Sequence, residues 1–172
     1  MKAAVLLLAA AAAVKAPDPV TFPGAADAKD PSGRSRVVFV AAPPGQSPRL
    51  ALEDSKTGAS TPLLTIGRAA TVFWSPDGGA LAVTDRRSAS SSTVLVAVPG
   101  QAAVTDLAPL LARTLGPLPE QTGNRNVHLE VVRWLDARKL RVRLRGFGAH
   151  DPGGFDELFD YELPGRFRRA VF

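Results

Sequence analysis

The segment Phe73–Thr84 constrains the fold of this chain more than any other part of it. Phe73 and Trp74 end an apolar run, Ser-Pro-Asp-Gly follows, and Leu81 and Val83 then resume at alternate positions. Proline presets φ, Asp can bond its own backbone and Gly tolerates positive φ, so these four residues favour a tight turn. The pattern therefore predicts two β-strands joined by this turn.

The residues Trp74, Ser75, Pro76, Asp77 and Gly78 resemble the repeat of TolB-type β-propellers. Blades of that family carry a Trp-Ser-Pro-Asp-Gly turn followed by a short apolar strand. The resemblance covers one to two blades only. It implies a β-sheet scaffold that makes contacts with proteins.

A second segment matches the first in kind. Trp134 is followed by Asp136 and by the apolar positions Leu140 and Val142, with a shorter turn that lacks Ser-Pro and Gly. Two copies at wide spacing indicate a repeat without establishing one.

The N-terminus predicts export. Lys2 precedes an apolar run from Ala3 to Ala13, which is shorter than the roughly 20 residues that span a bilayer. We therefore interpret residues 1–16 as a signal peptide cut after Ala13 or Ala16, with an uncleaved anchor as the alternative. The chain has no cysteine, which excludes both a lipoprotein and disulfides. The predicted location is periplasmic or secreted, with no stable membrane insertion after cleavage.

The mature chain divides by composition. Residues 17–35 carry Pro, Gly, Asp and Ser without apolar periodicity, which predicts a flexible leader. Residues 36–172 form a single β-rich domain with two halves, 36–100 and 104–172. A helix is predicted over 105–115, capped by Thr105 and ended by Gly116 and Pro117. The predicted strands cover 36–41, 49–53, 63–66, 70–74, 80–84, 93–98, 127–134, 139–145 and 156–163.

This number of strands decides the predicted architecture. A propeller closes with four to eight four-stranded blades, whereas eight or nine strands make about two. The fold class is therefore mainly β, an antiparallel sandwich or rolled sheet of propeller-blade-like strands with one helix, and not a closed propeller. The predicted core consists of Val38, Leu50, Leu52, Phe73, Trp74, Leu81, Val83, Val94, Val96, Trp134, Val142, Leu144, Phe159 and Tyr161.

A row of arginines admits two interpretations. Arg141, Arg143 and Arg145 alternate with apolar residues, so they share one face of a strand. They form either an anion or phosphate site or, as we favour, a ladder of ion pairs with the carboxylates of segment 156–163 across a hairpin loop, 146–154. If cleavage follows Ala16, Lys2 and Lys15 leave with the signal and the net charge falls from +5 to +3. Together with export, this modest charge argues against nucleic acid.

No catalytic, cofactor-binding or metal constellation stands out. The segment His150–Asp156 resembles a metal loop only loosely, and with His128 the chain has two histidines, too few for a zinc site built on histidine alone. No Gly-x-Ser-x-Gly elbow or phosphate-binding loop is present. Asp54 or Asp77 with Asp136 can serve as acid and base, although Asp at a turn usually bonds the local backbone.

The sequence therefore predicts an exported, non-enzymatic domain that contacts a protein partner in the bacterial envelope, with oligomeric state open. Binding would use a sheet edge or the loops 85–92 and 146–154. Three alternatives stay open: an inhibitor or immunity-type protein against an envelope enzyme, an enzyme of unfamiliar type, and a structural homo-oligomer.

Overall fold

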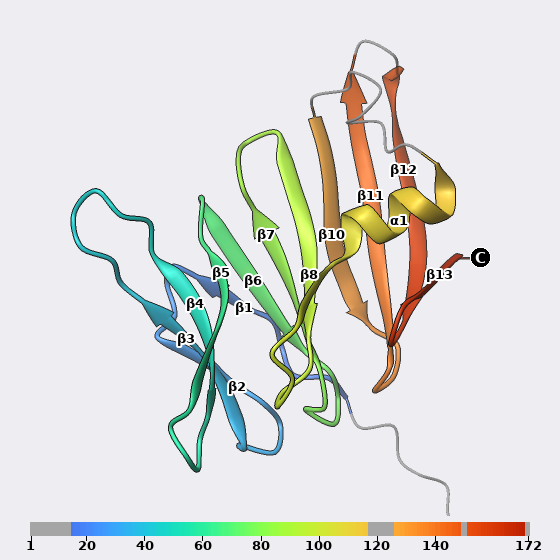
Figure 1. Ribbon diagram of the computed structural model, residues 1–172. Coiled ribbons are helices and arrows are strands. Elements are labelled where there is room, and N and C mark those ends of the chain that lie inside the picture. The colour runs from blue at the N-terminus through green and yellow to red at the C-terminus, as the bar shows by residue number, and fades with distance from the viewer. Residues whose placement is uncertain (1–14, 117–125, 149–150, 171–172) are drawn as a thin grey trace, which may run out of the picture.

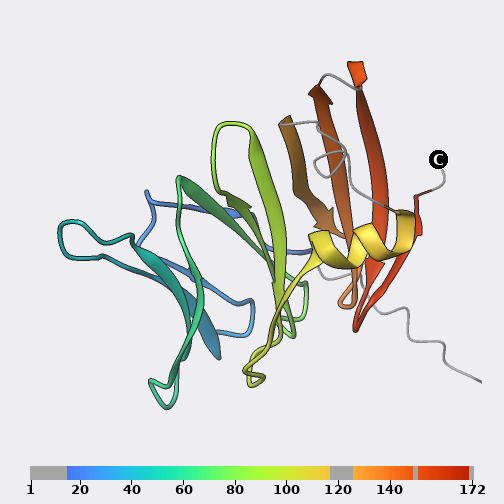
Figure 2. The ribbon, with the colours of Figure 1, turned by 45° about the horizontal axis from the view of Figure 1, so that its top comes forward.

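The computed structural model describes residues 15–116, 126–148 and 151–170 (Figure 1). This part of the chain contains thirteen strands and one helix. The strands form three groups that spread like a fan (Figures 1 and 2). The predicted mainly-β class, with one helix and no closed propeller, is confirmed. Within the described residues, no helix has the length and apolarity needed to cross a membrane.

The first unit is a four-stranded antiparallel sheet in chain order. It consists of β2 (Asp27–Lys29), β3 (Ser35–Val40), β4 (Arg49–Asp54) and β5 (Ser60–Thr65). Pro62 lies in β5, which is an edge strand and so tolerates a residue without an N–H donor.

The second unit repeats this antiparallel order. Its strands are β6 (Ala69–Trp74), β7 (Leu81–Arg86), β8 (Ser91–Ala97) and the short β9 (Val104–Asp106), and β1 (Val20–Phe22) adds to the free edge of β6. The turn between β6 and β7 is the one that the sequence predicts.

The helix α1 (Leu107–Leu115) connects the second unit to the third. Its N-cap is Asp106 rather than the predicted Thr105, and the Asp106 carboxylate accepts a hydrogen bond from the Ala108 N–H at 3.0 Å. Asp106 takes this role because α1 begins at Leu107, so that Asp106, the last residue of β9, directly precedes the helix. Leu107 and Leu111 are fully buried, whereas Leu115 is 47% exposed.

The third unit is again antiparallel and in chain order. It consists of β10 (Asn126–Trp134), β11 (Lys139–Gly148), β12 (Asp151–Glu162) and β13 (Arg166–Arg169). A short parallel bridge, His128 with Ser92, connects β10 to β8 and so joins the second and third units into one sheet.

Two hydrophobic cores hold the fan together. One lies between the first and second units and contains Phe22, Leu50, Trp74 and Leu81. The other lies under α1, between the second and third units, and contains Leu107, Trp134 and Phe159. The second unit therefore contributes one face to each core.

Three expectations differ from the structure. Residues 17–35 were predicted to be a flexible leader, yet they hold β1 and β2, and Phe22 is fully buried. Four-stranded units number three rather than about two, because β1, β2, β9 and β13 are too short for a periodic pattern to show. In β3 the buried apolar side chain is Val37 and not the predicted Val38, which is only partly buried. The predicted core residue Phe73 of β6 is also only partly buried.

Candidate functional site

Each unit begins with a strand that ends in the same kind of turn. After β6, the Ser75 N–H donates to the Ala80 carbonyl at 2.9 Å and the Gly78 N–H donates to the Ser75 carbonyl at 3.0 Å. After β2, Asp30 makes the equivalent pair of bonds with Ser35 and Gly33, at 2.9 and 3.1 Å. The turn after β10 is shorter, as predicted, and is closed by Leu135 and Lys139 at 2.7 Å.

The copy after β2 was missed by the sequence analysis. Asp30 holds the place of Ser75, since its carboxylate accepts the Ser35 N–H at 2.9 Å just as the Ser75 hydroxyl accepts the Ala80 N–H at 2.9 Å. The signal that could have found it is a proline one residue after the first turn position and a glycine two residues later, present in both copies. Without a tryptophan before it, this signal is weak.

Both motif tryptophans reach back to the preceding unit. The Trp74 indole N–H donates to the Ala28 carbonyl of β2 at 3.1 Å, and the Trp134 indole N–H donates to the Phe73 carbonyl of β6 at 2.9 Å. Buried indoles need a partner for their N–H, and here the partner is always the first strand of the unit before. The two tryptophans therefore fix the angle between successive units.

The turn aspartates are committed to their own turns. The Asp77 carboxylate accepts the Gly79 N–H at 2.9 Å and the Ser75 hydroxyl at 2.7 Å, and these bonds hold its pKa below the usual range. Asp136 accepts the Arg138 N–H at 2.8 Å, and Asp54 accepts the Thr57 N–H at 2.7 Å. None of these hydrogen bonds joins Asp136 to Asp54 or Asp77, so they form no acid–base pair.

A groove of about 490 Å³ lies between the turn of the second unit and the end of β10. We call it the turn groove. It brings together Trp74 and Pro76 of the first motif with Trp134 of the second. The segment Lys15–Pro19, apart from Asp18, forms part of its wall. The full lining is Lys15, Ala16, Pro17, Pro19, Phe73, Trp74, Pro76, Val132, Arg133, Trp134 and Leu135.

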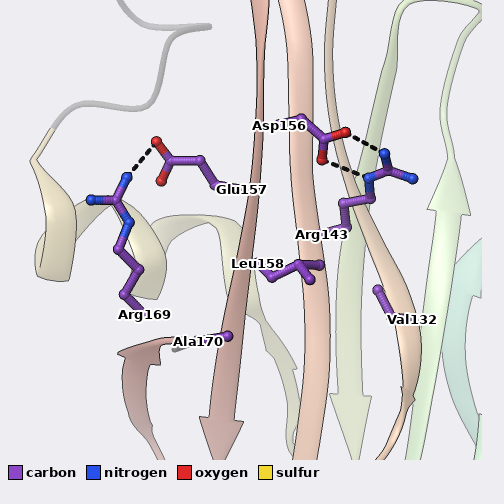
Figure 3. Close-up of a pocket in the computed structure, with 7 residues that line it drawn as sticks. All are labelled: Val132, Arg143, Asp156, Glu157, Leu158, Arg169 and Ala170. Carbon is purple, nitrogen blue, oxygen red and sulfur yellow. Dashed lines mark hydrogen bonds and ion pairs between the residues drawn. The ribbon is translucent and has the colours of Figure 1, made fainter. Parts of the chain in front are cut away.

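The arginine row of β11 pairs with carboxylates, as the ladder interpretation predicts. Arg141 makes two hydrogen bonds to Asp160, at 2.7 and 3.1 Å. Arg143 makes two to Asp156, one of them at 2.6 Å (Figure 3). Arg145 differs from the prediction, because it pairs with Glu130 of β10 and not with β12.

A shallow recess beside this row shows how the pairs are arranged. Leu158 lies between the Arg143–Asp156 pair and the Arg169–Glu157 pair, in which nitrogen and oxygen are 2.7 Å apart (Figure 3). Each guanidinium in this recess has its own carboxylate. Such pairs at the surface stabilise by about 0–1 kcal/mol each, so we assign the recess a structural role.

The Arg141–Asp160 pair predicts a pH dependence of stability. The guanidinium of Arg141 lowers the pKa of the Asp160 carboxyl, and Asp160 is only 8% exposed. Its contribution is present above the unfolded-state pKa of about 4 and is lost as pH falls through the lower folded-state value. Asp160→Asn should therefore lower the free energy of unfolding by about 1.5–3 kcal/mol at pH 7, and by much less at pH 3. Urea unfolding at both pH values measures this.

Glu162→Gln is the matched control for that experiment. Glu162 lies on the same strand and is exposed. Its removal should change stability by no more than about 0.5 kcal/mol. Equal losses for both variants, or a loss for Asp160→Asn that persists unchanged at pH 3, would contradict the assignment.

The predicted binding loops are shorter in the structure. In the segment 85–92, β7 continues to Arg86 and β8 begins at Ser91, and Asp85 and Ser92 are buried. One oxygen of Asp85 has no hydrogen-bond partner, and burial raises the pKa of this group. In the segment 146–154, β11 continues to Gly148 and β12 begins at Asp151, so Pro152, Gly153 and Gly154 lie in a strand and not in the predicted loop. His150 lies outside the described residues.

No cluster of three or more metal-ligating side chains occurs in the described ranges. His128 lines a different pocket, at the start of β10, where its Nδ1 lies 3.4 Å from the Ser92 hydroxyl.

Known structures offer a partial likeness. TolB from Acinetobacter baumannii matches with 16% identity and a TM-score of 0.42 over 85% of this chain and 32% of that one. A putative TolB from Agrobacterium tumefaciens matches with 14% identity and a TM-score of 0.41 over 84% of this chain and 44% of that one. These neighbours bear the name of the family that Trp74–Gly78 resembles.

The chain spans less than half the length of either TolB structure, so what those whole proteins do is not transferred to it. No protein-family model matches the sequence, and no curated protein does so either.

Proposed function

We propose that this protein is an exported, non-enzymatic binding domain of the bacterial envelope that contacts a protein partner through the turn groove. The observation that carries the proposal is the lining of the groove, in which Trp134 and Pro76 lie beside the chain's own proline-containing segment Lys15–Pro19. A proline-containing stretch of the chain thus borders the aromatic side chains of the groove.

The chemistry of the groove suits a peptide of that kind. Proline-rich segments are extended before they bind, so docking them on aromatic surfaces costs little conformational entropy. Trp74 and Trp134 are 3% and 6% exposed, so they are held in the cores beneath the groove and contribute only their outermost atoms to its lining. Val132 is 42% exposed at the wall of the groove and offers an apolar contact that the fold itself does not use fully.

The position at which the predicted signal peptide is cleaved decides which residues form the wall of this groove. Cleavage after Ala13 would leave Lys15 and Ala16 in its wall, whereas cleavage after Ala16 would remove both. N-terminal sequencing of the exported protein distinguishes the two, and the second result would give a more open groove. The signal peptide itself stays a prediction, because residues 1–14 lie outside the described residues.

Capture from envelope extract tests the proposal. The full chain, exported by its own N-terminus with a C-terminal tag, is incubated with envelope extract of its source organism, and the retained proteins are identified by mass spectrometry. We expect one stoichiometric partner that survives moderate salt. Val132→Asp should reduce its capture by about tenfold or more, since a charge would face an apolar contact.

Phe147→Asp is the matched control. Phe147 is also an exposed apolar residue of the third unit, at 58%, but it does not line the groove. Equal capture by the Val132→Asp and wild-type proteins would reject the groove. A folded monomer that retains nothing would reject the partner, and a self-associating protein would favour the homo-oligomer instead.

A further inference from the structure

A second pocket, of about 450 Å³, lies at the opposite end of β6 and β10 from the motif turns. Its charged and polar lining consists of Arg68, Arg86, Ser88, His128, Glu130 and Arg145. These residues come from both the second and the third unit, on either side of the point where β8 and β10 pair. We call this recess the arginine pocket.

Charge in the arginine pocket is not balanced. Glu130 is the only carboxylate in its lining, and it is shared by two guanidiniums. Its oxygens lie 3.1 and 3.3 Å from two nitrogens of Arg145 and 4.0 Å from one of Arg86. Arg68 makes no ion pair with any described residue. Three guanidiniums and one carboxylate leave a formal charge of +2.

The neighbouring arginines lie in a row whose charge is closer to balance than that of the pocket. Arg141 and Arg143 lie on the same face of the same strand as Arg145. Arg143 pairs with Asp156, and Arg141 makes two hydrogen bonds to Asp160, which also lies 3.5 Å from the Lys139 ammonium. These three cations and two carboxylates leave a formal charge of +1. A row of solvated ion pairs therefore explains them and does not explain the pocket. Like charges held in one recess repel one another unless an anion joins them.

We infer that the arginine pocket binds a phosphate monoester group. Such a group carries a charge of about −1.5 to −2 at pH 7, which complements the pocket's formal charge. One guanidinium can donate two parallel hydrogen bonds to two oxygens of a phosphate group. A hydroxyl such as that of Ser88 can donate a further hydrogen bond. The volume lies within the range of pockets for small ligands, about 300–1,000 Å³.

This chemistry has two possible sources in an exported protein: a soluble phosphate ester, or the headgroup of a lipid at a membrane surface. Both present the same group to the same arginines. Isothermal titration of the full chain with inorganic phosphate and with a hexose 1-phosphate, at constant ionic strength, tests the first source. Sedimentation with vesicles containing phosphatidic acid, a monoester, against vesicles containing phosphatidylglycerol, a diester, tests the second.

Saturable binding of a soluble probe, or a preference for phosphatidic acid vesicles, is the expected result and identifies the source. Arg68→Gln and Arg86→Gln should each weaken that binding by about tenfold, because each removes a charge-assisted contact. Arg166→Gln, an exposed arginine of β13 outside the pocket, should leave it unchanged. Glu130→Gln should tighten it by about threefold or more, because the carboxylate competes for the same guanidiniums.

Three results would overturn the inference. The first is the absence of saturable binding to soluble probes together with equal sedimentation on both kinds of vesicle. The second is a loss in Arg166→Gln as large as in Arg86→Gln, which would indicate general charge attraction. The third is weaker binding in Glu130→Gln. The turn groove plays no part in this experiment, so its outcome is independent of the partner proposal.

Discussion

Replacing Gly146 with alanine should destabilise this protein by about 3–5 kcal/mol, a large part of the 5–15 kcal/mol typical of a domain. A Cβ at this position would lie 2.1 Å from the carbonyl oxygen of Asn126 and 2.7 Å from the Phe155 ring. The ring can turn, but the carbonyl belongs to β10 and cannot move without breaking the pairing of β10 with β11. Urea unfolding measures the loss.

Gly153→Ala is the control for that result. Gly153 lies on β12, close in sequence to Phe155, and an added Cβ there would meet nothing within 4 Å. Its free energy of unfolding should stay within about 0.5 kcal/mol of the wild-type value. If both variants unfold at the same urea concentration, close approach at Gly146 does not limit the third unit.

The strand that contains Gly146, β11, shows what the sequence can and cannot predict. The alternation of Arg141, Arg143 and Arg145 with apolar residues predicts the strand, its faces and the ion-pair ladder. That Arg145 turns to Glu130 on the other neighbouring strand depends on which carboxylate lies nearer after folding. Alternation along one strand cannot decide between two neighbours.

The beginning of the chain was the largest error, and its reason is physical. β1 and β2 have three residues each, so neither shows an alternating pattern long enough to detect. They are ordered by long-range contacts: β1 pairs with β6, and the carbonyl of Ala28 accepts the Trp74 indole N–H. Composition rich in Pro, Gly and Ser thus predicted flexibility where tertiary pairing provides order.

The candidate sites were predictable only in part. The residues of the turn groove that belong to the motifs, Trp74, Pro76 and Trp134, can be read from the sequence, but their meeting in one groove cannot. For the arginine pocket the sequence offered only Arg145, as one of a row that could form an anion or phosphate site, because Arg68, Arg86 and Arg145 lie in separate segments. Only the packing of the third unit against the second brings them together.

Trp74→Ala should destabilise the protein by about 3–5 kcal/mol. Trp74 is 3% exposed and lies in the core between the first and second units, and its truncation removes a large apolar side chain and leaves the Ala28 carbonyl without its donor. Trp74→Phe keeps most of the apolar surface and should cost less, about 1–3 kcal/mol, chiefly for the lost hydrogen bond. Chemical unfolding of both variants measures these losses.

Hydrogen exchange shows where that loss falls. Since Trp74 contacts the first unit and Trp134 contacts the second, Trp74→Ala should increase exchange mainly in β2 to β5, and Trp134→Ala mainly in β10 to β13. The second unit shares both cores and should be protected longest in either variant. Uniform loss of protection over all three units in both variants would contradict this expectation. It would mean that the three units unfold cooperatively, and that each tryptophan stabilises the whole domain rather than the interface between units at which it lies.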